Sequence, residues 1–243
     1  MILPTVSKPL FAASLIALLP LPVRAAEARR PPTVEDLLAV KTVGSIALSP
    51  DGRFVAYGVR EADFAQDAFV TRLWLAPTVG GAPYPLTAAG KSAGTVRFSP
   101  DGRFIGFLSA REGDKDQIFV IGAEGGEAIR LTKSETAVAD FAWSRDGKQI
   151  AFVAPEPDAQ ALKDRKEKYG DYAVVRREYA FSQVFTLDVA EGLKAPVSGT
   201  QRTHGREWSV EGSPAWSPDG TALAFPRPPL QTWWKAAPPT SSC

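Results

Sequence analysis

A four-residue turn motif recurs along the chain and constrains its fold more than any other feature. Its four copies are Ser49-Pro50-Asp51-Gly52, Ser99-Pro100-Asp101-Gly102, Ser144-Arg145-Asp146-Gly147 and Ser217-Pro218-Asp219-Gly220. Pro presets φ near the value that a turn needs, Asp can accept a bond from the backbone two residues on, and Gly accepts positive φ. Each copy lies between two segments of alternating apolar residues, so the motif predicts a β-hairpin that repeats along the chain.

The residues around each turn align in columns. The following strand has an aliphatic column (Val55, Ile105, Ile150, Leu223), then a small column (Ala56, Gly106, Ala151, Ala224), then an aromatic column (Tyr57, Phe107, Phe152, Phe225). The preceding strand ends on a large apolar column (Leu48, Phe98, Trp143, Trp216). Residues two apart share one face of a strand. Third strands are expected at residues 73–75, 118–121 and 184–187, and fourth strands at 86–87, 131–132 and, with a weaker match after Gly192, 196–197.

Four antiparallel strands in a unit of this length are typical of a β-propeller blade. The predicted fold is all-β, a partial β-propeller of about three and a half four-stranded blades that start near residues 44, 94, 138 and 213. A short N-terminal helix is expected before the first blade. The longer spacing between the last two turns predicts an insertion in blade three, and residues 157–170 favour a helix there. The partial propeller spans 29–225, and an irregular Pro-rich tail follows at 226–243.

Residues 1–28 have the features of a secretory signal peptide. Lys8 supplies the positive start, residues 11–19 form a short apolar core, and small residues offer cleavage sites near Ala25 and Ala28. Pro20 and Pro22 interrupt the apolar segment, which is too short for a membrane span, and an uncleaved anchor is the alternative. The chain is therefore expected to be exported, periplasmic or secreted, with no stable membrane span after cleavage.

The sequence offers little catalytic chemistry. The formal net charge is +1 without a basic cluster, which argues against nucleic acid as a partner. No Gly-x-Ser-x-Gly segment is present, and His204 is the only His, in a polar loop where solvation is the simpler explanation. One Cys, Cys243, and one His cannot build a zinc site, and no phosphate-binding glycine motif occurs. Catalytic, cofactor-binding and metal-binding residues are each predicted to be none.

One segment outside the repeat mixes aromatic residues with both charge signs, at residues 171–179. Its carboxylate Glu178 is the single predicted substrate-binding residue, because it could bind the amine of a peptide. Arg176 or Arg177 could bind a carboxylate. The simpler alternative is a solvated insertion with internal ion pairs.

The entry to the first blade carries a family resemblance. Residues 32–38 have the features of a short capped helix, with Thr33 as N-cap and Asp36 three residues later, and lead directly into the blade at residues 46–57. This arrangement resembles the start of serine peptidases of the prolyl oligopeptidase family, in particular the acylaminoacyl-peptidase and dipeptidyl-aminopeptidase type. The resemblance covers about residues 32–225. TolB-like periplasmic propellers share the repeat itself.

The resemblance implies an N-terminal propeller of seven or eight blades that caps an α/β-hydrolase domain and admits only small peptides. The catalytic Ser, Asp and His of that family have no matching positions here, so this chain is expected to be inactive alone. Propeller carboxylates hold the substrate amine in some relatives, and Glu178 is the nearest candidate. The tail has five Pro in 18 residues and cannot continue blade four, which suggests truncation or a frameshift.

Three interpretations follow from these features. The first is the substrate-gating portion of an exported serine peptidase whose full-length parent acts on peptides. The second is a stand-alone TolB-like periplasmic propeller that binds a protein partner through its exposed blade edges. The third is a pseudogene product without function.

Overall fold

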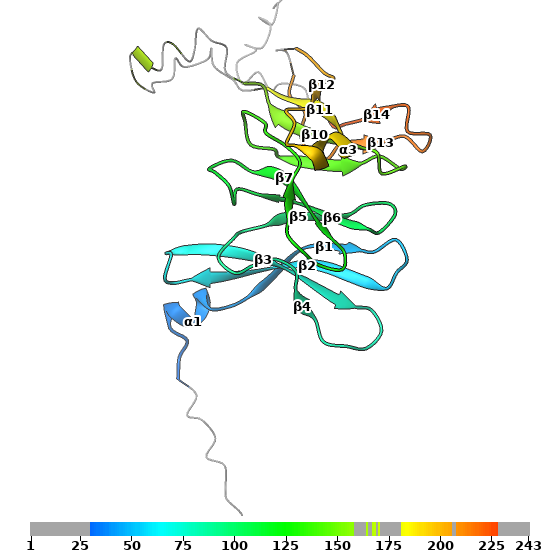
Figure 1. Ribbon diagram of the computed structural model, residues 1–243. Coiled ribbons are helices and arrows are strands. Elements are labelled where there is room, and N and C mark those ends of the chain that lie inside the picture. The colour runs from blue at the N-terminus through cyan, green and yellow to red at the C-terminus, as the bar shows by residue number, and fades with distance from the viewer. Residues whose placement is uncertain are drawn as a thin grey trace, which may run out of the picture.

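The computed structural model describes residues 30–157, 164, 167–168, 170, 181–205 and 208–227. Short helix α1 (Val34–Leu38) precedes four antiparallel sheets that follow one another in chain order (Figure 1). These sheets are blades one to four. The helix begins as predicted, since Asp36 N donates to Thr33 Oγ1 at 3.3 Å and Thr33 N to Asp36 Oδ2 at 2.8 Å.

The sheets confirm the predicted all-β partial propeller, with strands paired in sequence order in each blade. Blade one comprises β1 (Thr42–Leu48), β2 (Phe54–Asp63), β3 (Ala68–Pro77) and β4 (Tyr84–Pro85). Blade two comprises β5 (Gly94–Phe98), β6 (Phe104–Ser109), β7 (Gln117–Gly122) and β8 (Ile129–Arg130). Blade three comprises β9 (Asp140–Trp143), β10 (Gln149–Pro155), β11 (Ser182–Asp188) and β12 (Thr200–Gln201), with α3 (Val189–Lys194) before its last strand. Blade four has β13 (Ala215–Trp216) and β14 (Leu223–Ala224) among the described residues.

The repeated turn has one hydrogen-bond geometry in all four copies. In the first copy, Ser49 Oγ donates to Asp51 Oδ1 at 2.6 Å, and that oxygen also accepts from Arg53 N at 3.0 Å. Ser49 Oγ accepts from Phe54 N at 2.9 Å, and Gly52 adopts a φ of +71°. The other copies repeat the three bonds. Ser and Asp therefore satisfy the backbone of the turn and fix the register of the hairpin.

These bonds also hold the turn carboxylates in their charged form. The hydroxyl of Ser217, followed by the hydroxyl and amide of Thr221, lowers the pKa of Asp219 to about 2. In the first turn the Ser49 hydroxyl and the Arg53 amide likewise lower the pKa of Asp51. The turn Asp residues are thus acceptors within the scaffold.

Successive turns also contact one another. A Cβ on Gly102 would lie 3.6 Å from Cδ of Pro50, and a Cβ on Gly147 would lie 3.6 Å from Cδ of Pro100. Each of these prolines therefore packs beside the glycine of the next turn. Besides presetting φ, Pro helps to align neighbouring blades.

The residue columns correspond to the two faces of each blade. We call the face toward the preceding blade the N-face and the face toward the following blade the C-face. The aliphatic and aromatic columns lie on the N-face, where Ile105, Phe107, Ile150 and Phe152 are each 0% exposed. The small column lies on the C-face, and Ala56 packs with Ile105 and Phe107 of the next blade. Large side chains on one blade therefore pack against small side chains on the blade before it.

Gly106 marks the closest approach between these faces. A Cβ on Gly106 would lie 3.0 Å from Cε2 of Phe141 and 3.3 Å from Cζ2 of Trp143, both on the N-face of blade three. The aromatic rings thus occupy the volume that a larger residue in the small column would need.

Two details of the fourth strands differ from the sequence-based expectation. The fourth strands of blades one and two, β4 and β8, end just before the residues predicted for them, 86–87 and 131–132. Leu86 N and Leu131 N still donate to the third strand at 2.8 Å. The expected fourth strand of blade three at 196–197 is wrong, because β12 takes that place. Val197 instead pairs with blade two, donating to Leu131 O and accepting from Lys133 N, each at 2.9 Å.

Helix α3 explains this exchange. Asp188 caps it by accepting from Glu191 N at 3.1 Å, so the chain after β11 turns into a helix. Gly192 lies within α3, and its absent side chain allows close approach to Leu131, whose Cδ2 would be 3.2 Å from a Cβ there. The residues between β11 and β12 thereby cover the outer edge of blade two, which protects that edge from other pairing partners.

The predicted helical insertion at residues 157–170 falls mostly outside the described residues. Within the described part of the chain, no helix is long and apolar enough to cross a membrane.

We predict that Gly106→Ala destabilises the protein by about 1–3 kcal/mol, because the added methyl group overpacks the contact with Phe141 and Trp143. Gly113→Ala is the matched control, since a Cβ at Gly113 meets no atom within 4 Å. Its effect should stay within about 0.5 kcal/mol. The free energies of unfolding from urea titration compare the two, and equal stabilities would contradict the proposed close packing.

Candidate functional site: the inner strands and the cavities beside them

The first strands of the blades lie at the edge where neighbouring sheets converge. β1 lies against β5, and β9 lies against β13. In a propeller the blades are arranged around a central channel, so this converging edge faces the axis. Polar side chains along it are the ones that a molecule in the channel would meet.

Three polar residues join blades two, three and four along this edge, and we call them the inner-strand cluster: Arg97, Asp140 and Ser213. Arg97 Nη2 donates to Asp140 Oδ1 at 2.9 Å and to Ser213 Oγ at 3.0 Å. Ser213 Oγ in turn donates to Asp140 Oδ2. Asp140 Oδ1 also accepts from the amide of Phe141 at 2.7 Å. The cluster therefore links residues far apart in sequence through charge-assisted hydrogen bonds.

The inner-strand cluster is partly accessible. The side chains of Arg97 and Asp140 are 36% and 20% exposed, which leaves part of the pair in contact with solvent. The Arg97 guanidinium carbon lies 5.7 Å from the ring centroid of Phe141, within cation–π range. Nε of Arg97 is buried and has no hydrogen-bond partner among the described residues. This guanidinium is held by packing as well as by its carboxylate.

A cavity of about 530 Å³ opens where β5 and β9 begin. Its wall combines apolar residues with a few polar ones, including Thr71, Ser92, Thr95 and Asp116. Burial raises the pKa of the Asp116 carboxyl, because the charged form loses solvation there. Asp116 is the one carboxyl group in the wall of this cavity, and it could accept hydrogen bonds from a bound amine or amide.

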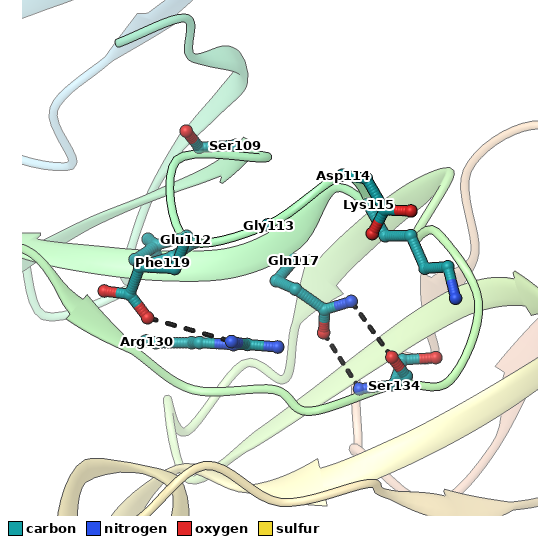
Figure 2. Close-up of a pocket in the computed structure, with 9 residues that line it drawn as sticks. All are labelled: Ser109, Glu112, Gly113, Asp114, Lys115, Gln117, Phe119, Arg130 and Ser134. Atoms are coloured by element: carbon teal, nitrogen blue, oxygen red, sulfur yellow. Dashed lines mark hydrogen bonds and ion pairs between the residues drawn. The ribbon is translucent and has the colours of Figure 1, made fainter.

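A smaller cavity of about 120 Å³ lies on blade two (Figure 2). Figure 2 shows the Gln117 amide directed at the backbone of Ser134: Oε1 accepts from Ser134 N at 2.9 Å, and Nε2 donates to Ser134 O at 3.1 Å. Gln117 Oε1 also accepts from Thr132 Oγ1 at 2.8 Å. At the cavity wall, Arg130 lies 3.7 Å from Glu112. The Gln117 amide is thus engaged within the protein.

Blade three repeats this arrangement, which identifies it as scaffold. Gln183 Oε1 accepts from Thr203 Oγ1 at 2.7 Å, and Val184 N donates to the same hydroxyl at 2.8 Å. Thr132 likewise accepts from Ile118 N at 2.9 Å, and Thr87 from Leu73 N at 3.1 Å. In three blades, therefore, the hydroxyl of a Thr that follows the fourth strand accepts a hydrogen bond from a backbone amide of the third strand. We assign the smaller cavity to this structural repeat and the candidate site to the inner strands.

The residues singled out from sequence are not part of this site. Glu178, Arg176 and Arg177 fall outside the described residues, so the predicted amine-binding role of Glu178 stays a prediction. His204 is exposed in the loop after β12. Across the described residues, no group of three or more His, Cys, Asp or Glu side chains could hold a metal ion.

Sequence analysis missed the inner-strand cluster, although one signal for it was present. Two residues before the turn Ser, blades one, three and four carry Ala47, Ala142 and Ala215, whereas blade two carries Arg97. A charged residue in an otherwise small column marks a departure from scaffold chemistry. Its partner Asp140 comes from the next blade, and only the fold reveals that pairing.

We predict a coupling free energy of about 1–2 kcal/mol between Arg97 and Asp140 in a double-mutant cycle with Ala substitutions, because the pair is partly desolvated and hydrogen-bonded. The control is Lys41–Glu61, whose side chains are 65% and 38% exposed. That pair should yield about 0.2–0.5 kcal/mol. Denaturant unfolding of the four proteins in each cycle measures both values. A coupling for Arg97–Asp140 no larger than that of the control would show that the cluster does not link the blades.

Comparison with known proteins relates the chain to peptidases. No family model matches it. It is 30% identical over 207 residues to the Uncharacterized peptidase YuxL of Bacillus subtilis, a match that spans 79% of this chain and 30% of that protein. It is 27% identical over 133 residues to Dipeptidyl-peptidase 5 of Porphyromonas endodontalis, which spans 55% of this chain and 19% of that protein. The chain thus spans less than a third of the length of either relative.

The fold agrees with this relationship. The acylaminoacyl peptidase of Pyrococcus horikoshii, in its uncomplexed form, superposes with a TM-score of 0.53 at 15% identity. The superposition covers 75% of this chain and 27% of that chain. At this identity the likeness concerns the fold alone.

Proposed function

We propose that this chain forms the substrate-gating wall of a serine peptidase that acts on small peptides. The proposal rests on its family, because the chain belongs with the propeller parts of prolyl oligopeptidase-family peptidases. The carrying observation is the sequence similarity to the Bacillus peptidase, which covers most of this chain and a minor part of the relative. The reacting groups then belong to an α/β-hydrolase domain. This chain contributes the selection of what reaches them.

The converging edge of the blades supports a gating role. A propeller admits substrate through its channel only if the channel wall keeps its shape, and the inner-strand cluster ties three blades together at that wall. Arg97 and Asp140 offer both charge signs beside the channel, which suits the polar backbone of a peptide. The cavity at the start of β5 and β9 adds the Asp116 carboxyl to the surface that a peptide would meet.

Gating is tested with a chimera in which residues 32–225 of this chain replace the aligned part of the Bacillus peptidase. We expect the chimera to cleave short chromogenic peptides and to spare casein, because the propeller excludes long chains from the active site. The comparison is the peptidase with its whole propeller deleted, which should lose this discrimination. This chain alone should not react with a fluorophosphonate probe. A chimera that cleaves casein as readily as the propeller-deleted enzyme would contradict the proposal.

We further propose that residues 1–28 direct export. The full chain expressed in a Gram-negative host should then appear in the periplasm with a new N-terminus close to Arg29, which mass spectrometry of the intact protein measures. Lys8→Glu combined with Leu15→Arg should retain the chain in the cytoplasm, because the charged start and the apolar core are both altered. Recovery of the uncut chain in the cytoplasm or the membrane would contradict cleavage after export.

A further inference from the structure

The wall of the larger cavity, where β5 and β9 begin, contains polar groups that the scaffold does not use. The residues described in this wall come from blades one to three, the blades described with all four strands. The cavity lies at the end of the blades opposite the repeated turns, because β5 starts there and runs toward its turn. Its shape therefore follows from the contacts between consecutive blades and does not involve blade four.

Asp116 is the only charged residue described in this wall, and it is exposed. Its backbone oxygen accepts from Val138 N at 2.8 Å, whereas its carboxylate takes part in no hydrogen bond or ion pair within the described part of the chain. The turn carboxylates and Asp140, by contrast, all accept hydrogen bonds from the protein. The carboxylate of Asp116 therefore keeps its capacity to accept hydrogen bonds from a ligand.

Thr95 is a second residue of the wall that departs from the repeat. It lies four residues before its turn, as Ser45, Asp140 and Ser213 do in the other blades, yet it alone of these four adopts a positive φ, +44°. A register shift in β5 places Thr95 in a bulge. Positive φ is strained for a β-branched residue, and strain of this kind is concentrated at ligand sites. Among the described residues, none is hydrogen-bonded to the Thr95 hydroxyl.

The rest of the wall is mainly apolar and is rich in small residues. Its apolar members include Ala110, Ala137, Ala139, Leu108, Val138 and Pro155. Leu108 and Val138 belong to the hydrophobic core between blades two and three, so this part of the wall is firmly packed. The cavity thus combines an apolar lining, which suits a hydrocarbon chain, with one carboxylate, which suits a cation.

We propose that this cavity binds the basic side chain, Lys or Arg, of a peptide, with the Asp116 carboxylate accepting hydrogen bonds from the cation and the Thr95 hydroxyl accepting one more. The methylene groups of that side chain pack against the apolar lining, because Lys and Arg carry their charge at the end of a hydrocarbon stem. The inference rests on the proposed function, which makes a peptide the ligand. It adds which side chain the channel wall selects.

Two other ligands match only part of this wall. The amine at a peptide N-terminus has no hydrocarbon stem between its charge and the backbone, so it would leave the apolar lining unfilled. A neutral aliphatic side chain would fill the lining and leave the carboxylate without a cation. A basic side chain matches both parts, and three peptides therefore distinguish the three ligands.

Isothermal titration calorimetry of the full 243-residue chain measures this binding without a catalytic domain. The probe is acetyl-Ala-Arg-Ala-amide, and the comparison peptide carries norleucine in place of Arg, which keeps a stem and lacks the cation. We expect the Arg peptide to bind about tenfold more tightly, because it gains a charge-assisted hydrogen bond. The norleucine peptide with a free terminal amine should bind no better than its acetylated form.

Substitutions in the wall locate the contact. Asp116→Asn should weaken binding of the Arg peptide about tenfold and leave binding of the norleucine peptide unchanged. Asp114→Asn is the matched control, since Asp114 lies in the wall of the smaller cavity, and it should change neither affinity. Thr95→Gly should weaken binding of the Arg peptide and raise the midpoint of thermal unfolding, because Gly adopts positive φ without strain. Thr95→Ser keeps the hydroxyl and should retain binding.

Equal affinities of the wild-type chain for the Arg and norleucine peptides would overturn the proposal without any variant. An Asp116→Asn chain that binds the Arg peptide as tightly as the wild type would also overturn it, as would a free-amine norleucine peptide that matches the Arg peptide. The gating proposal fails by a different result, a chimera that cleaves casein. The preference for Arg in calorimetry would still support the assignment of this cavity in that case.

Discussion

The packing of large side chains on small ones between consecutive blades is the constraint on which the rest of the structure depends. A single sheet of this kind has little core of its own, because its apolar residues point to both faces. Stacking places Ile105 and Phe107 on Ala56, and Phe141 and Trp143 on Gly106. The hydrophobic core is therefore a series of layers between blades. Blade spacing follows from the small column, which sets how closely two sheets approach.

The hydrogen bonds at the blade ends make this layered packing possible. The Ser-x-Asp-Gly turn fixes the register of the first two strands, and a one-residue slip would move every large side chain to the wrong face. Thr87, Thr132 and Thr203 fix the outer end of each complete blade by accepting from the third strand. Register and packing thus support each other. The polar hydrogen bonds determine which face of the blade the large side chains occupy, and the apolar columns form the packed layer on that face.

Much of the fold could be predicted from sequence, because turn chemistry and strand periodicity are local. The columns predict the hairpins, the third strands and the propeller class from the sequence alone. Features that depend on a neighbouring blade could not be predicted in the same way. Val197 follows α3 and pairs with the outer edge of blade two. Within the described residues, no strand of blade two itself pairs with that edge. The inner-strand cluster was missed for the same reason, as Arg97 and Asp140 meet only after two blades have packed.

The contrast between scaffold and site has a functional consequence. Polar groups that recur in several blades, such as the turn Asp residues and Gln117 with Gln183, already use their hydrogen-bonding capacity within the protein. Arg97 has no counterpart in the other blades and keeps part of its side chain in solvent. One charged residue in a small column adds nothing to the packing of the repeat. In a channel wall, the same residue adds a polar contact that holds neighbouring blades in place. Departure from the repeat, rather than the repeat itself, is therefore where we propose that this propeller carries the chemistry that a substrate meets.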